Sequence, residues 1–210
     1  MNEILPGVFH WTAKHPRIGI EVSSHWLEDG GVAIDPLLSD EQRVDWFAER
    51  ETPPTAVLLS NRHHHRSASV FQDAFGATVH VSRPGIHAFE GPEHDVHPFD
   101  FGDTLPGGAV AVEIGGICPD DTALFLPAHR AILVADGIVS GGPHGEGDIG
   151  FVPATLMDDP ERTRATLLDA FRRVLADHDF DHVLLAHGPP MIGDGRARLQ
   201  AFVDEGGRTA

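Results

Sequence analysis

Three short, almost wholly apolar segments constrain the fold of this chain more than any other feature. They are TAVLLS at 55–60, AILVADG at 131–137 and DHVLLAHGPP at 181–190. Apolar runs of this length, bounded by Gly, Pro or polar residues, are typical of strands that are buried on both faces. Two sheets that face each other, with helices on the outer sides, would bury such strands well.

The remaining pattern supplies the helices and the other strands of such an α/β layered fold. The segment 158–179 is the clearest helix, because Asp159 can cap it, Pro160 suits its first turn, and apolar residues recur along one face. The segments 17–27 and 32–36 predict two strands joined by an Asp-Gly hairpin turn. No linker or repeat divides the chain, so we expect one domain over residues 1–210.

Two further helices are expected in the first half of the chain. Ser39 followed by Gln42 resembles a capping box and predicts a helix that continues to about residue 50. The segment 67–76 predicts a second helix, which Gly76 ends.

Charge and composition exclude several classes of partner. The 15 basic and 32 acidic residues give a net charge of −17, which repels nucleic acids and anionic membranes. The chain contains no apolar stretch of the roughly 20 residues that a membrane span requires. The N-terminus has no pattern of an export signal, and the single cysteine, Cys118, suits a reducing compartment. We therefore expect a cytoplasmic protein with a small-molecule substrate.

Polar residues with metal-binding chemistry follow the apolar strands. The sequence NRHHHR at 61–66 comes directly after the first strand, Asp136 follows the second and His187 follows the third. Loops at strand ends are the usual location of sites in layered folds. Imidazole and carboxylate groups together suit Zn, Fe or Mn.

Four segments, taken in order, resemble the metallo-β-lactamase fold superfamily over nearly the whole chain. They are SSHWLEDGGVAIDP at 23–36, FDFGDTLPGG at 99–108, TALFLPAHRAILVADGIV at 122–139 and VLLAHGPP at 183–190. The resemblance implies a four-layer αββα sandwich and a metal-dependent hydrolase. It also implies that Asp136 is the bridging aspartate and that His187 is the closing metal histidine.

The main metal motif of that superfamily, His-x-His-x-Asp-His after a strand ending in Thr or Ser, is altered in this chain. With Ser60 at the strand end, its four ligand positions fall in order on Asn61, His63, His65 and Arg66. The mid-chain histidine of the family falls on Ile117, which cannot ligate a metal. A shifted register would pair His63 with His65 but would leave Ser67 and Ala68 at the last two positions. Only His63, Asp136 and His187 still have the residue type that the family places at the corresponding ligand position.

The altered motif implies a reduced site that holds one divalent cation. The expected ligands are His63, His65, Asp136 and His187, with His65 and Asp136 as catalytic residues. We expect zinc, with iron or manganese as alternatives. Arg62, Arg66 and Asn61 are the candidate substrate-binding residues, because guanidinium groups grip carboxylates and phosphates. Such a site would hydrolyse a small ester, thioester or amide.

Two other interpretations stay open. In the first, Asp136 forms an ion pair with Arg62 or Arg66 in place of the metals, and the protein binds a small anion without a metal. In the second, the chain is a catalytically inactive structural homologue. His64 is expected to point away from its neighbours, because three consecutive side chains on an extended segment cannot share one direction. The Gly-rich segment 140–151 is expected to lie over the site, where His144 or Glu146 could touch a ligand.

Overall fold

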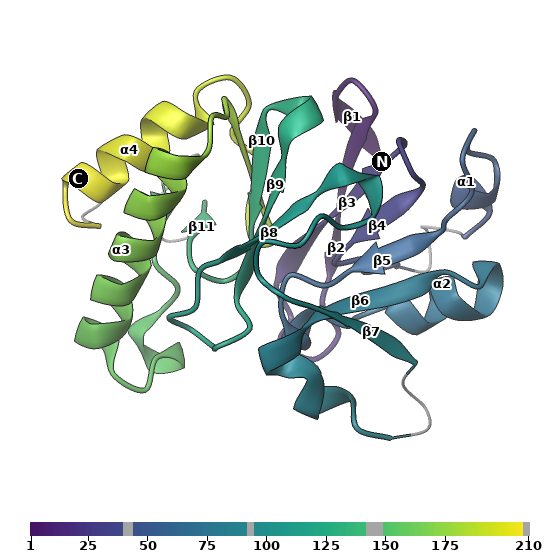
Figure 1. The fold of residues 1–210 in the computed structure, drawn as a ribbon, viewed down its shortest axis with the longest axis horizontal. Coiled ribbons are helices and arrows are strands. Elements are labelled where there is room, and N and C mark those ends of the chain that lie inside the picture. Colours follow the sequence, from purple (N-terminus) through teal and green to yellow (C-terminus); the bar gives the residue numbers. More distant parts are fainter. Residues whose placement is uncertain (40–43, 92–94, 142–148, 208–210) are drawn as a thin grey trace.

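The structure is a computed structural model that describes residues 1–39, 44–91, 95–141 and 149–207. Within these residues the chain forms two large facing sheets and a short two-stranded ribbon (Figure 1). The first sheet contains, in order, β1 (Asn2–Leu5), β2 (Val8–Lys14), β3 (Glu21–Leu27), β4 (Val32–Ile34), β5 (Ala56–Leu58), β6 (Thr78–Ser82) and β7 (Val96–Phe99). The second contains β13 (His182–Leu185), β10 (Ala131–Val134), β9 (Thr122–Leu126) and β8 (Val110–Glu113). The ribbon pairs β11 (Val139–Ser140) with β12 (Ile149–Gly150).

The strand directions bring three strand ends to the same part of the molecule. Strands β4, β5 and β6 are parallel to one another, with Ile34 opposite Leu58 and Leu58 opposite His80. In the second sheet β10 and β13 are parallel, with Val134 opposite Leu185. The residues that follow β10 and β13 therefore leave the sheet at the same edge.

The interior between the two sheets is a continuous apolar layer. Residues of the first sheet, such as Val8, Leu27 and Leu58, belong to the same buried cluster as Leu124 and Leu133 of the second sheet. Their side chains alternate along each strand with residues that face the outer helices. This alternation explains why the strands are apolar almost throughout.

Helices cover the outer face of each sheet. On the first sheet lie α1 (Asp45–Ala48) and α2 (Ala68–Phe75), where Phe47 and Phe71 pack with Trp26 and Val57. On the second sheet lie α3 (Pro160–Asp177) and α4 (Gly195–Asp204). Figure 1 shows the two helix pairs on opposite sides of the molecule. The four-layer αββα sandwich expected from the sequence is confirmed.

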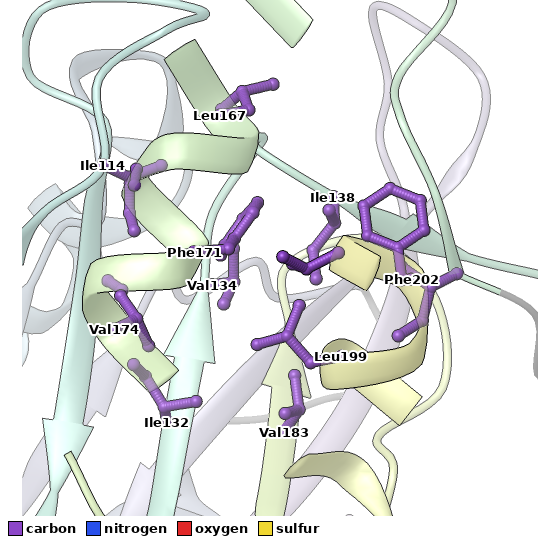
Figure 2. Packing of buried hydrophobic residues seen from close by; sticks show 14 of the residues in the cluster. Ile114, Ile132, Val134, Ile138, Leu167, Phe171, Val174, Val183, Leu199 and Phe202 are labelled. Atoms are coloured by element: carbon purple, nitrogen blue, oxygen red, sulfur yellow. The ribbon is translucent and has the colours of Figure 1, made fainter. Parts of the chain in front are cut away.

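The apolar face of α3 supplies much of the buried cluster between the second sheet and its outer helices. Leu167, Phe171 and Val174 pack against residues of β10 and against α4 (Figure 2). Phe171 is fully buried at the centre of this cluster. The helix begins as the sequence predicts, because the Asp159 carboxylate accepts a hydrogen bond from the Arg162 amide at 3.1 Å.

Most of the other predicted elements are also present. The hairpin turn joins β3 to β4, and α2 ends at Gly76 in the left-handed conformation, with φ of 67°. The proposed capping residue Gln42 lies outside the described residues, as do His144 and Glu146 of the Gly-rich segment. None of the helices in the described part of the chain is long and apolar enough to cross a bilayer.

Candidate metal centre

Three loops bring a metal-type cluster together, and each loop follows a strand. His64 comes from the loop after β5, Asp136 follows β10, and His187 follows β13. One donor atom from each of these side chains lies within 4.8 Å of the other two. Residues at three distant positions in the sequence thus converge because their strands end at the same place.

A short helical turn sets the direction of His64. Arg62–His64 form one 3-10 turn, and Asn61 precedes it with extended backbone. The Asn61 side-chain oxygen accepts a hydrogen bond from the His63 amide at 2.9 Å, which caps the turn. The turn rotates His63 to the surface and buries His64.

The Asp136 carboxylate lies between two imidazoles. Its Oδ1 atom is 2.9 Å from His187 Nε2 and 3.4 Å from His64 Nε2. Its Oδ2 atom accepts a hydrogen bond of 2.8 Å from the Asn61 side-chain amide. The amide therefore fixes one oxygen and leaves the other directed at the two histidines.

A buried carboxylate holds the far side of His64. His64 Nδ1 lies 2.9 Å from Asp35 Oδ2 and 2.9 Å from Ser60 Oγ. Asp35 also accepts hydrogen bonds from the Ser60 amide, at 2.8 Å, and from the Ser60 hydroxyl. With Nδ1 held in this way, Nε2 of His64 is directed at Asp136. A carboxylate on the outer nitrogen of a histidine is a common support for a metal ligand.

The electrostatics of the cluster follow from this arrangement. Burial and the Arg66 guanidinium oppose protonation of His64, but the Asp136 and Asp35 carboxylates outweigh them and raise the pKa of His64 to about 9. Burial also opposes ionisation of Asp136, yet His64 and His187 hold the pKa of this carboxyl well below its usual range. At neutral pH the cluster therefore contains a carboxylate and an imidazolium when no metal is bound.

Arg66 places a permanent positive charge beside the cluster. Its backbone is in the left-handed region, with φ of 44°. Its Nη1 atom donates to the carbonyl oxygens of Ser23, at 2.7 Å, and Asp35, at 2.8 Å. Burial lowers the pKa of Arg66 from its ordinary value, and Asp35 and Asp136 counteract that effect. Since a fixed guanidinium repels cations, this position disfavours a second divalent ion.

A second pair of carboxylates lies next to the cluster. Asp120 forms an ion pair with the Arg62 guanidinium and accepts a hydrogen bond of 2.6 Å from the Arg62 amide. Asp121 is fully buried, and its Oδ1 atom accepts a hydrogen bond of 3.3 Å from the Asp136 amide. Burial and the nearby Asp136 charge raise the pKa of Asp121 well above its ordinary value. The surroundings of Asp121 therefore favour its uncharged form.

Comparison with solved structures identifies the architecture. The metallo-β-lactamase family protein TTHA1429 from Thermus thermophilus is 18% identical, with a TM-score of 0.68 over 97% of this chain and 80% of that one. A metallo-β-lactamase from Pontibacter korlensis is 14% identical, with a TM-score of 0.70 over 97% of each chain. TTHA1623, solved in a di-iron-bound form, is 20% identical, with a TM-score of 0.64 over 90% of this chain and 98% of that one. The chain has the metallo-β-lactamase fold. No protein-family model and no curated protein sequence matches it.

Within the metallo-β-lactamase fold, the structure brings together a different group of candidate donors from the one expected from the sequence. Asp136 and His187 do lie together, but the third member of the group is His64 and not His63 or His65. His63 is exposed. The His65 ring packs against the Phe89 ring, with centroids 5.6 Å apart. The expectation that His64 points away is wrong, because the segment forms a 3-10 turn rather than an extended strand.

The three candidate substrate-binding residues have different surroundings. Arg62 is paired with Asp120, and Asn61 is buried against Asp136. Arg66 lines the cavity described below. Neither arginine forms the direct ion pair with Asp136 that the metal-free interpretation expected, because Arg62 binds Asp120 and Arg66 donates to backbone carbonyls.

A cavity of about 810 Å³ opens over the cluster. His64, Asp136 and His187 lie in its wall together with Arg66 and the exposed His63. Cavities of about 300–1,000 Å³ are typical of small-molecule sites. A substrate in this cavity would therefore reach the cluster directly.

Proposed function

We propose that this protein is a metal-dependent hydrolase that holds one divalent cation at His64, Asp136 and His187. The convergence of these three donors in the wall of a substrate-sized cavity carries the proposal. Two imidazoles and one carboxylate form a donor set that suits zinc, and iron or manganese are alternatives. The metallo-β-lactamase fold supports the assignment, and one protein that shares it has been solved in a di-iron-bound form.

The surrounding residues fit a single cation. Asp35 holds His64 by Nδ1, which leaves Nε2 for the metal, and Asn61 holds one oxygen of Asp136. Three protein ligands with an open fourth position are typical of catalytic rather than structural zinc sites. The positive charge of Arg66 counts against a second cation.

The bound cation would supply Lewis acidity, which polarises a carbonyl group and makes water more acidic at neutral pH. The protein would orient the substrate in the cavity, and His63, which is exposed in the cavity wall, could exchange protons with it. Arg66 would stabilise negative charge that develops on the substrate near the site. An ester, thioester or amide of a small molecule is the substrate class that this chemistry serves, and we expect the protein to act in the cytoplasm.

The test is the metal content of the protein purified without a histidine tag and then exposed to zinc, manganese or iron. About one ion per chain is expected, together with hydrolysis of esters or thioesters. His64→Gln should abolish metal retention, whereas His63→Gln, the adjacent and exposed histidine, is the matched control and should retain it. No metal in the parent protein under any of these conditions would contradict the proposal.

A metal-free anion-binding protein is the second candidate. The contacts of His64 and His187 with Asp136 satisfy this carboxylate without any metal ion. This function predicts that small anions bind equally well with and without a chelator. The hydrolase predicts that the chelator abolishes turnover and that added metal restores it.

A further inference from the structure

The wall of the cavity above the cluster is mostly apolar. Most of its apolar side chains come from the turn between β2 and β3 with the start of β3, the segment after β8 and the segment after β12. They include Ile18, Ile20, Val22, Ile117, Val152 and Leu156. The turn between β2 and β3 is closed by hydrogen bonds between His15 and Ile20 and between Gly19 and His15, each of 2.8 Å. A defined turn therefore presents two isoleucines to the cavity.

Three of these side chains are unusually exposed. Among the described residues, five large apolar side chains are exposed, and three of them line this one cavity: Ile18 at 57%, Ile20 at 50% and Leu156 at 65%. Exposed apolar surface that gathers around a cavity marks a binding site, because covering it with an apolar ligand removes it from water.

The part of the cavity lining that the structure describes lacks the acidic excess of the whole protein. The chain carries a net charge of −17. Among the described lining residues, however, two arginines, Arg17 and Arg66, balance two acids, Glu21 and Asp136. The side chain of Arg66 also has two buried nitrogens, Nε and Nη2, that make no hydrogen bond within the described part of the chain. An anion that enters this cavity therefore meets no excess of acidic side chains from the described residues, and the Arg66 guanidinium lies in the wall to bind it.

We infer that the site accepts an aliphatic acyl chain of medium length and releases it as a carboxylate. The acyl tail would lie against Ile18, Ile20 and Leu156, and its carboxyl end would face Arg66 and the His64 cluster. This inference rests on the proposed function, since hydrolysis of an acyl ester or thioester adds water across the acyl bond and yields the carboxylate and the free alcohol or thiol. Beyond the proposed function, the inference is that the acyl tail determines which substrates the site binds.

Calorimetric binding of octanoate to the zinc-treated protein tests the inference. Octanoate should bind about 50-fold more tightly than acetate, because roughly half of its additional methylene groups would leave water. It should bind about tenfold more tightly than octanol, which lacks the negative charge. Equal affinities for octanoate and acetate would overturn the inference.

Variants of the cavity wall, with a matched control, test where the acyl tail of octanoate binds. Leu156→Ser and Ile18→Ser should each weaken octanoate binding about fivefold and leave acetate binding unchanged. Val70→Ser is the control, because Val70 is also an exposed apolar residue, at 38%, but lies on α2 outside the cavity lining. If Val70→Ser weakened octanoate binding as much as Leu156→Ser, or if Leu156→Ser removed self-association of the protein and not octanoate binding, the inference would fail.

The design separates this inference from the proposed function. A protein that binds zinc but does not distinguish octanoate from acetate would be a hydrolase with another substrate, so the inference alone would fail. A protein that binds octanoate through Leu156 but never retains metal would contradict the hydrolase. In that protein the apolar cavity wall would bind an acyl tail without hydrolysis. The inferred release of the acyl chain as a carboxylate would then be overturned.

Discussion

The Asp35 carboxylate and the His64 imidazole, both buried, are joined by a contact of 2.9 Å between Oδ2 and Nδ1. Asp35 follows β4 and His64 follows β5, and these strands are parallel neighbours in the first sheet. The contact fixes which nitrogen of His64 is presented to Asp136. The candidate metal centre therefore depends on a residue that would not touch the metal.

Asp35→Asn should weaken zinc binding about 10- to 100-fold, because the amide keeps the size of the side chain but loses the charge that orients His64. Competition with a chromogenic chelator would measure the change. Asp45→Asn is the control, because Asp45 is an exposed acid in the first turn of α1, and it should leave the affinity unchanged. Equal zinc affinities of Asp35→Asn and the parent protein would show that Asp35 does not support the site.

The sequence predicted the layers of this fold and two of the three cluster members, but not the third. Asp136 and His187 could be predicted because each directly follows an apolar strand, and a strand end has a defined place in a layered fold. The choice among three consecutive histidines depended on the backbone of 61–66. The register of the family motif selected His63 and His65, and the expectation of extended backbone turned His64 away. Asn61 instead caps a 3-10 turn there, which no hydrophobic pattern reveals.

Asp35 could have been found from the sequence, because it ends the apolar run VAID. The pattern around it predicts only a hairpin, whereas its side chain is directed to the site by a left-handed backbone, with φ of 48°. The apolar cavity wall was also not predicted, because Ile18 and Leu156 lie in turns and show no periodic pattern.

The Cys118 thiol should not react with iodoacetamide in the folded protein at pH 8. Burial, aided by Asp121 and Asp120, raises the pKa of this thiol above its ordinary value, and its exposed fraction is only 4%. Mass spectrometry should show one added group per chain only after unfolding in guanidinium chloride, since the chain has one cysteine. Complete alkylation of the folded protein within minutes would contradict the burial of this residue.

His10 should make the protein less stable in mild acid. Burial lowers its pKa from 6.5 to about 4, with a smaller contribution from the N-terminus. Between these values the unfolded state binds a proton that the folded state does not, so this residue lowers the free energy of unfolding as the pH falls from 6.5 to 4. The neighbouring His25 acts in the same direction, because burial holds its pKa well below the ordinary value, with additional effects from His10, Asp35 and Arg66.

The variant His10→Gln isolates this contribution. Its free energy of unfolding should change less steeply with pH between about 4.5 and 6, by at most about 1.4 kcal/mol per pH unit. Urea denaturation at a series of pH values measures both slopes. Lys14→Gln, an exposed substitution on the same strand, should keep the parent slope. A slope for His10→Gln equal to that of the parent would exclude the assigned role of His10.

Phe171→Ala should destabilise the protein by about 3–5 kcal/mol, because it removes a fully buried ring from the cluster between α3, α4 and the second sheet. Denaturant unfolding measures the loss, and Val70→Ala on the exposed surface of α2 should change the stability by less than about 0.5 kcal/mol. A loss below about 1 kcal/mol for Phe171→Ala would mean that α3 does not pack as described.

A crystal grown with zinc and measured at the zinc absorption edge tests whether His64, Asp136 and His187 hold the metal. One anomalous peak per chain is expected, at about 2.0–2.2 Å from His64 Nε2, His187 Nε2 and an oxygen of Asp136. A peak coordinated by His63 or His65 in place of His64, or two peaks in the same site, would contradict this expectation.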